Sequence, residues 1–175
     1  VTVYERVPAP GPVGAGITLQ PTGLYVLAEL GLYERVVSRG ARLDGLRCVT
    51  TEGRPVVTLA YRDLGEGVFG LGTHRGVLFD ALFDAVNHAP GVTLRLGVAG
   101  EDLADAGRGW HYVVDDCGER HGPHELVVIA DGARSRFRDD TTLGKRVDAY
   151  PWGALWFVAK DPERRFDSEL FQVVR

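Results

Sequence analysis

Residues 126–138 read Leu-Val-Val-Ile-Ala-Asp-Gly-Ala-Arg-Ser-Arg-Phe-Arg, an apolar run that ends abruptly in Asp131-Gly132 and then turns basic. Consecutive apolar residues, Leu126 to Ala130, are typical of a buried strand in a parallel sheet. In open α/β sheets, ligands bind beyond the carboxyl ends of the strands, where Asp131 and Gly132 would lie. Gly132 allows the backbone to approach a ligand closely, and Asp131 can accept hydrogen bonds from ligand hydroxyls. The arginines that follow can neutralise the charge of a phosphate. The stretch therefore predicts a nucleotide-binding turn, although Asp-Gly alone is also common in ordinary turns.

On either side of this stretch, the patterns predict strands and helices that do not alternate strictly. A helix is expected from about Thr22, with Leu24 and Leu27 at helical spacing. Another is expected after Thr73 as N-cap, with Leu78 and Leu82 on one face. The predicted strands are residues 1–4, 46–51, 55–61, 92–96, 110–115, 126–130, 154–159 and 170–174, and Glu52-Gly53-Arg54 predicts a hairpin between the second and the third. We therefore expect a mixed α/β fold, with a Rossmann-like nucleotide-binding core and an inserted β-rich layer.

Composition narrows the function classes. Against 24 Asp and Glu, the 175 residues include 20 Lys and Arg, giving a net charge of −4, which argues against nucleic-acid or anionic-membrane partners. No apolar run approaches the roughly 18 residues of a membrane-spanning helix. Two cysteines, Cys48 and Cys117, favour a reduced compartment. We expect a cytoplasmic protein without stable membrane insertion, whose oligomeric state the sequence does not specify.

The absence of methionine affects how the ends of the chain are interpreted. The sequence contains no Met and opens on Val1-Thr2-Val3-Tyr4-Glu5, a strand pattern already under way. We therefore expect an internal segment of a longer protein, incomplete at both ends.

Three further features are candidates for ligand binding. Glu5 follows the first strand, where an acid can accept hydrogen bonds from ribose hydroxyls; the alternative is a solvated strand end. Gly14-Ala15-Gly16 lacks the third glycine of a dinucleotide fingerprint, leaving a flexible loop or a close approach to a flat ligand. Arg75, in the first turn of a predicted helix, opposes the helix dipole unless it faces an anion such as pyrophosphate or a nearby acid.

The sequence gives weaker support for a metal site or a hydrolase. Cys117, His121 and His124, near Asp115 and Asp116, have metal-ligand character, but a tetrahedral zinc site normally needs a second ligand pair. A polar turn between two strands is the favoured interpretation, and no metal site is predicted. Ser135 lacks the G-x-S-x-G context of a hydrolase.

Taken in order, these features resemble a known family. Glu5, the Gly14–Ile17 loop with Leu19 and Pro21, Leu30-Gly31-Leu32, His74-Arg75, and Ala130-Asp131-Gly132 with Ser135 and Arg138 occur in the order and approximate spacing of the FAD-dependent aromatic-hydroxylase-type monooxygenases. These are single-component flavoproteins with the para-hydroxybenzoate hydroxylase fold. The resemblance runs in register from Val1 to about Arg138.

The resemblance implies roles for particular residues. Glu5 would hold the adenosine ribose, Arg75 the ribityl-pyrophosphate region, and Asp131-Gly132 the second nucleotide motif, which serves FAD and the nicotinamide cofactor. The Gly14 loop would lie near the isoalloxazine and the substrate. The implied cofactor-binding residues are Glu5, Arg6, Arg75, Asp131, Gly132, Ser135 and Arg138, and the implied substrate-binding residues are Gly14, Gly16 and Ile17. No catalytic side chain is implied.

The activity implied is hydroxylation of a small aromatic or related electron-rich substrate. NADPH or NADH would reduce FAD, and O₂ would form a flavin C4a-hydroperoxide that transfers oxygen. The family's N-terminal G-x-G-x-x-G and its later Gly-Asp motif are absent here. The chain alone is therefore expected to be inactive. The implied organisation is a flavin-binding core in residues 1–60, running into substrate-layer strands, the same core with the Asp-Gly motif in 61–140, and the start of a substrate-binding sheet in 141–175.

Two alternatives stay open. One is another flavoprotein of the same fold, a halogenase or a reductase, although Lys145 and Lys160 do not lie in a halogenase-like context. The other is a catalytically inert relative that serves as an interaction module.

Overall fold

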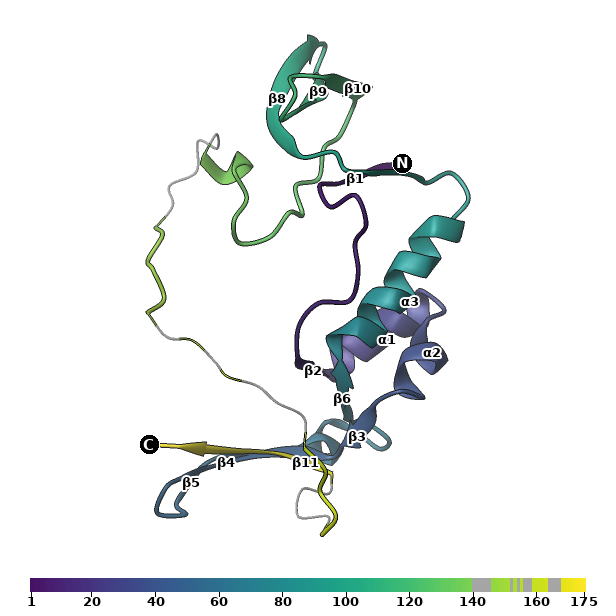
Figure 1. Cartoon of the computed structure of the whole chain (residues 1–175). Coiled ribbons are helices and arrows are strands. Elements are labelled where there is room, and N and C mark those ends of the chain that lie inside the picture. Colours follow the sequence, from purple (N-terminus) through teal and green to yellow (C-terminus); the bar gives the residue numbers. More distant parts are fainter. Residues whose placement is uncertain (140–145, 152, 154, 156–158, 164–167) are drawn as a thin grey trace. The chain divides into compact units, whose positions relative to one another are not determined.

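The computed structural model describes residues 1–139, 146–151, 153, 155, 159–163 and 168–175. These residues form two compact units: Val1–Pro10 with Ala89–Gly153, and Gly11–His88 with Ala154–Arg175. The described helices and strands make a mixed α/β fold with several sheets (Figure 1), which confirms the predicted class. The Rossmann-like core and the three-part division at residues 60 and 140 stay predictions.

The first unit contains a parallel strand pair and an antiparallel meander. Strand β1 (Thr2–Glu5) pairs in parallel with β7 (Thr93–Leu96). The meander has the order β10-β9-β8, and a 3₁₀ turn lies further along the chain. The bounds are β8 Gly100–Gly107, β9 Trp110–Asp115, β10 Arg120–His124 and η2 Phe137–Asp139. The Tyr4 hydroxyl and His124 Nε2, 2.9 Å apart, connect β1 to β10.

The apolar run at residues 126–130 is not a strand, and that prediction was wrong. The segment follows β10 without regular structure, and the side chains of Leu126 and Val128 are 78% and 76% exposed. A parallel strand needs hydrogen-bonded neighbours, and no described segment pairs with these residues. The hydrophobic pattern alone therefore did not produce a strand or burial.

The second unit is built around one antiparallel sheet and three helices. Strand β6 (Gly70–His74) lies between β2 (Gly16–Leu19) and β3 (Ala41–Leu43). The helices are α1 Pro21–Glu29, α2 Tyr33–Val37 and α3 Arg75–His88. Side chains from all three helices, the α1–α2 turn and β6 make up the main core of this unit: Leu24, Leu27, Leu32, Val36, Leu71 and Ala81.

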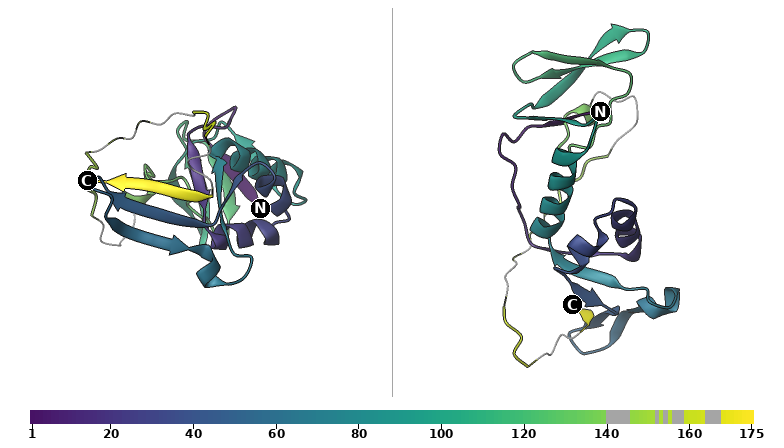
Figure 2. Two further views of the ribbon diagram at one scale, coloured as in Figure 1. Left: turned by 90° about the horizontal axis from the view of Figure 1, so that it is seen from below. Right: turned by 90° about the vertical axis from the view of Figure 1, so that its right-hand side faces the viewer.

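A second sheet in this unit has the strand order β11-β4-β5, and its three strands are seen side by side in the left view of Figure 2. Strands β4 (Gly45–Thr50) and β5 (Pro55–Ala60) form the predicted hairpin, and β11 (Glu169–Val174) adds in parallel to β4. The 3₁₀ turn η1 (Tyr61–Leu64) follows β5.

Two other predicted features differ in the structure or lie outside it. Thr73 is the fourth residue of β6 rather than an N-cap, and the backbone N–H of Gly76 donates instead to His74 Nδ1 at 3.0 Å. Thr73 is unavailable as a cap because its pairing with Ile17 keeps it in the sheet. The strand predicted at 154–159 falls largely outside the described residues.

The lengths of the helices bear on membrane insertion. The longest helix in the described ranges, α3, has 14 residues. None of the described helices has both the length and the apolar character needed to cross a bilayer.

Candidate functional site

The Gly14 loop and Arg75 lie together in the second unit. Strand β2 pairs with β6 so that Gly16 is opposite His74, and the backbone N–H of Arg75 donates to Ala15 O at 3.1 Å. Gly14 has φ +111°, and a Cβ at this position would lie 3.0 Å from Arg75 Cδ and 3.3 Å from Nη1. Glycine therefore allows the arginine to lie directly on the loop backbone.

The same loop packs on the first turn of α3. A Cβ at Gly76 would lie only 2.8 Å from the Cβ of Pro12, so this glycine permits the contact. Arg75 is exposed at the N-terminus of α3, and no ion pair is recorded for it among the described residues. The guanidinium and the positive end of the helix dipole together favour an anion here.

Glu5 ends β1 in the first unit. Its Oε1 accepts a hydrogen bond from the backbone N–H of Val7 at 2.8 Å, and its backbone carbonyl accepts from Val98 N at 3.0 Å. The carboxylate is half-buried, and its second oxygen has no recorded partner in the described part of the chain. The hydrogen bond from Val7 fixes one oxygen of this carboxylate, and the other oxygen can accept a hydrogen bond from a ribose hydroxyl. Arg6, the next residue, is exposed.

The Asp131–Arg138 segment closes on itself, also within the first unit. Gly132 has φ +87°, its carbonyl accepts from the Ser135 N–H at 3.1 Å, and Arg138 Nη1 donates to the carbonyl of Ala133. Asp131 is exposed at the start of this turn. The Ser135 hydroxyl is buried and has no hydrogen-bond partner in the described structure. The segment thus supplies one exposed carboxylate and one unsatisfied hydroxyl.

The predicted site residues therefore fall into three local groups. Gly14, Gly16 and Ile17 lie with Arg75 in the second unit. In the first unit, Glu5 ends β1 and Arg6 follows it, while the nucleotide-motif residues share one turn: Asp131, Gly132, Ser135 and Arg138. The geometry within each group is defined by the contacts above.

The cluster around Asp115 is explained by a turn between β9 and β10. Asp115 Oδ1 accepts from the N–H groups of Cys117 and Glu119, at 3.0 and 2.8 Å, and Oδ2 lies 2.9 Å from His121 Nε2. The hydrogen bond from His121 is the largest cause of a lowered pKa of the Asp115 carboxyl, and the two backbone N–H groups add to it. The carboxylate thus closes the turn predicted from the sequence.

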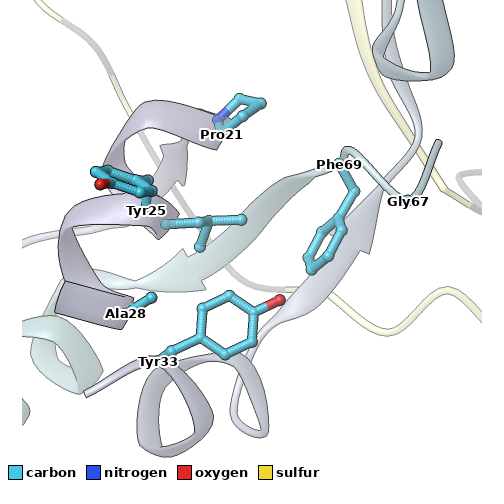
Figure 3. Close-up of a pocket in the computed structure, with 7 residues that line it drawn as sticks. Pro21, Tyr25, Ala28, Tyr33, Gly67 and Phe69 are labelled. Atoms are coloured by element: carbon cyan, nitrogen blue, oxygen red, sulfur yellow. The ribbon is translucent and has the colours of Figure 1, made fainter. Parts of the chain in front are cut away.

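Two features of the second unit were not predicted. The Tyr61 hydroxyl donates to Gln20 Oε1 at 2.7 Å, joining η1 to the residue after β2. A hollow of about 200 Å³ lies beside α1, with the rings of Tyr25, Tyr33 and Phe69 around it (Figure 3). None of the predicted site residues lines this hollow. The only local sequence signal for it is the aromatic side chains, which occur equally in cores.

The sequence of the chain is similar to those of known proteins. No family model matches the chain. Over 95% of its length it is 31% identical to the aurachin C monooxygenase/isomerase of Stigmatella aurantiaca, and over 90% it is 34% identical to the FAD-dependent monooxygenase pytG of Aspergillus terreus. The chain is homologous to FAD-dependent monooxygenases. This confirms the family resemblance, and the chain spans 44% and 47% of the lengths of these two relatives.

Solved structures agree with this relationship to FAD-dependent monooxygenases. The structure of pqsL from Pseudomonas aeruginosa matches 86% of the chain and 41% of its own length, with a TM-score of 0.67 and 22% identity. A mutant of 2-methyl-3-hydroxypyridine-5-carboxylic acid oxygenase matches 79% of the chain and 34% of its own length, with a TM-score of 0.64 and 25% identity. The described fold is therefore shared with this class of flavoprotein.

Proposed function

We propose that this chain is part of an FAD-dependent monooxygenase. The enzyme consumes NADH or NADPH and hydroxylates a small aromatic or related electron-rich substrate. The observation that carries the proposal is sequence similarity to named FAD-dependent monooxygenases along nearly the whole chain. One relative, from Streptomyces cremeus, is named for an aromatic substrate as 3-amino-4-hydroxybenzoate 2-monooxygenase, with 31% identity over 78% of the chain.

The residues present fit FAD. Among the described residues, one oxygen of the half-buried Glu5 carboxylate and the buried Ser135 hydroxyl have no hydrogen-bond partner, so the first can accept from a ribose diol and the second can bind beside the Asp131-Gly132 turn. Arg75 at the α3 N-terminus would hold the pyrophosphate or the adjoining ribityl chain. Each position therefore offers the hydrogen-bonding group or charge that its part of the cofactor needs.

When bound, FAD would supply the redox chemistry by which electrons from the nicotinamide cofactor reduce O₂, so that one oxygen atom enters the substrate and the other leaves as water. The residues of this chain would bind the cofactor and orient it. The absence of a side chain at Gly14 lets the Arg75 side chain lie on the loop backbone, which positions its charge. Arg75 balances phosphate charge, and Asp131 and Glu5 accept from hydroxyls. No proton transfer by a side chain is required of the described residues.

The test is the absorbance spectrum of the purified chain and of the longest product of its gene, with and without added FAD. Flavin bands are expected in the longer product, and Glu5→Gln and Arg75→Gln are expected to lower its flavin content at least about fivefold, since each removes a charged hydrogen-bonding group. Arg39→Gln, at an exposed arginine of the same unit, is the matched control. Colourless protein in every form would refute the proposal.

A further inference from the structure

The sheet β11-β4-β5 carries its charged side chains on one face only. Directly paired residues project from the same face of a sheet. Leu46 pairs with Leu59 and with Leu170, and Cys48 with Val57 and Gln172. We name the surface formed by Leu46, Cys48, Val57, Leu59, Leu170 and Gln172 the Leu46 face. Val174, two residues beyond Gln172, and its paired residue Thr50 extend it.

The opposite face carries the charge. Arg47 pairs with Phe171, and its guanidinium lies 4.9 Å from the centre of that ring and 3.2 Å from the Glu169 carboxylate. Arg47 and Glu169 are the charged residues of the three strands, whose residues are all described. The Leu46 face therefore has apolar side chains, the amide of Gln172 and the hydroxyl of Thr50, which accepts from the backbone N–H groups of Glu52 and Arg54, without a charged group from its own strands.

Part of this apolar face is exposed. Val57, Leu59 and Val174 retain 48%, 41% and 41% of their accessible surface. Leu46 and Leu170 are half-buried between them. A contiguous apolar surface of this kind is typical of a ligand or interaction site.

The Leu46 face adjoins the segment that carries the Gly14 loop. Tyr61 follows β5, and the extended Ala60 (φ −111°, ψ 121°) directs it to the same side as Leu59. The Tyr61 ring is buried, 3% exposed, and its hydroxyl donates to Gln20, the residue directly after β2. The face thus continues through Tyr61 to the strand that contains Gly16 and Ile17, for which the family resemblance implies substrate contact.

We infer that the Leu46 face binds the body of an uncharged, apolar substrate, with Gln172 as hydrogen-bond partner for its single polar group. The inference rests on the proposed function and names the substrate class of that site. A carboxylate placed here would lose water without gaining a counter-charge from these strands, which is costly. An apolar ring would bury the exposed surface of Val57, Leu59 and Val174 at no such cost.

The test uses methyl NMR of the chain, titrated with two ring compounds of matched shape, 2-naphthol and 2-naphthoate. Saturable shifts are expected at the methyls of Leu46, Leu59 and Val174 with 2-naphthol, and about tenfold weaker binding of 2-naphthoate, because its charge is not compensated. Leu59→Lys, which adds a charge to this face, is expected to weaken 2-naphthol binding about tenfold. Thr58→Lys places the same charge one residue away on the opposite face of the sheet. This variant is expected to change the affinity for 2-naphthol less than twofold.

A second variant tests the amide. Gln172→Leu is expected to weaken 2-naphthol binding severalfold while leaving 2-methylnaphthalene, which has no hydroxyl, unaffected. Equal affinity for the naphthoate, shifts confined to other residues, or equal effects of the two lysine variants would overturn the inference. Shifts at this face that grow with protein concentration without ligand would also overturn it, because a second copy would then be the occupant. Flavin content of the longer product is read separately, so failure here leaves the proposed function standing.

Discussion

Arg75 lies against the backbone of Gly14, with its Cδ 3.0 Å and its Nη1 3.3 Å from the position that a Cβ at Gly14 would take. The two residues are far apart in sequence and are joined by the β2–β6 pairing and by the hydrogen bond from Arg75 N to Ala15 O. The arginine is thus placed by a glycine rather than by an acidic partner among the described residues. This relationship makes Gly14 a positioning residue for the cation.

Gly14→Ala is expected to displace Arg75 and to destabilise the chain by about 1–2 kcal/mol, since alanine is strained at φ +111°. Thermal unfolding measures the stability, and flavin content of the longer gene product measures the displacement. Gly11→Ala is the control in the same loop, because a Cβ there meets nothing within 4 Å. Equal behaviour of the two variants would contradict the close contact.

Gly70→Ala and Gly23→Ala are expected to change stability in opposite directions. A Cβ at Gly70 would lie 2.8 Å from the buried ring of Tyr61, and overpacking costs about 1–3 kcal/mol. At Gly23, inside α1, the nearest atoms lie at an ordinary 3.9 Å, and alanine stabilises a helix interior by about 0.5–1 kcal/mol. Urea unfolding midpoints measure both, and a lower midpoint for Gly23→Ala would show that α1 does not tolerate the added methyl group.

The Asp115–His121 pair is expected to make the meander sensitive to acid. The pKa of Asp115 is lowered in the folded chain, chiefly by the hydrogen bond from His121. The stabilisation is therefore complete above the ordinary aspartate pKa of about 3.9 and is lost as the pH falls through the lower folded value. Asp115→Asn should reduce the urea midpoint at pH 7, and this deficit should shrink progressively as the pH is lowered below about 3.9. Asp116→Asn is the control at the neighbouring exposed acid, and an Asp115→Asn deficit that stays constant from pH 7 down through the acid range would reject the linkage.

Residues 126–130 are expected to exchange their amide hydrogens quickly, because no ladder hydrogen bond protects them in the described structure. Residues 111–114 in β9, paired on both sides, are the slow reference. Hydrogen exchange followed by mass spectrometry or NMR makes the comparison directly. Protection of 126–130 equal to that of β9 would restore the strand that the sequence predicts.

Local patterns were enough to predict many elements. The hairpin of β4 and β5 was predicted from two β-rich runs around Glu52-Gly53-Arg54, and α1 from the spacing of Leu24 and Leu27. Strand β9 was predicted at its observed bounds. These elements depend on turn residues and hydrophobic periodicity, which act over a few residues.

The missed strands depend on distant partners. Strand β2 contains Gly16, which has low strand propensity, and it forms because β6 pairs with it. The same pairing keeps Thr73 in the sheet and leaves the capping contact to His74. The candidate site shows the same difference between local and distant effects. The sequence indicated Gly14 and Arg75 as separate candidates, and only the tertiary structure shows that the Arg75 side chain lies against Gly14.

The sequence by itself determined the mixed α/β class, the family resemblance and the residue types suited to a dinucleotide, because each is encoded in composition, order and short spacing. Only the tertiary structure decided that residues 126–130 lie exposed, that Arg75 lies on Gly14, and that one face of the β11-β4-β5 sheet carries no charge. The physical reason is that strand pairing and side-chain contact join residues distant along the chain, and their free energy depends on which partners are present.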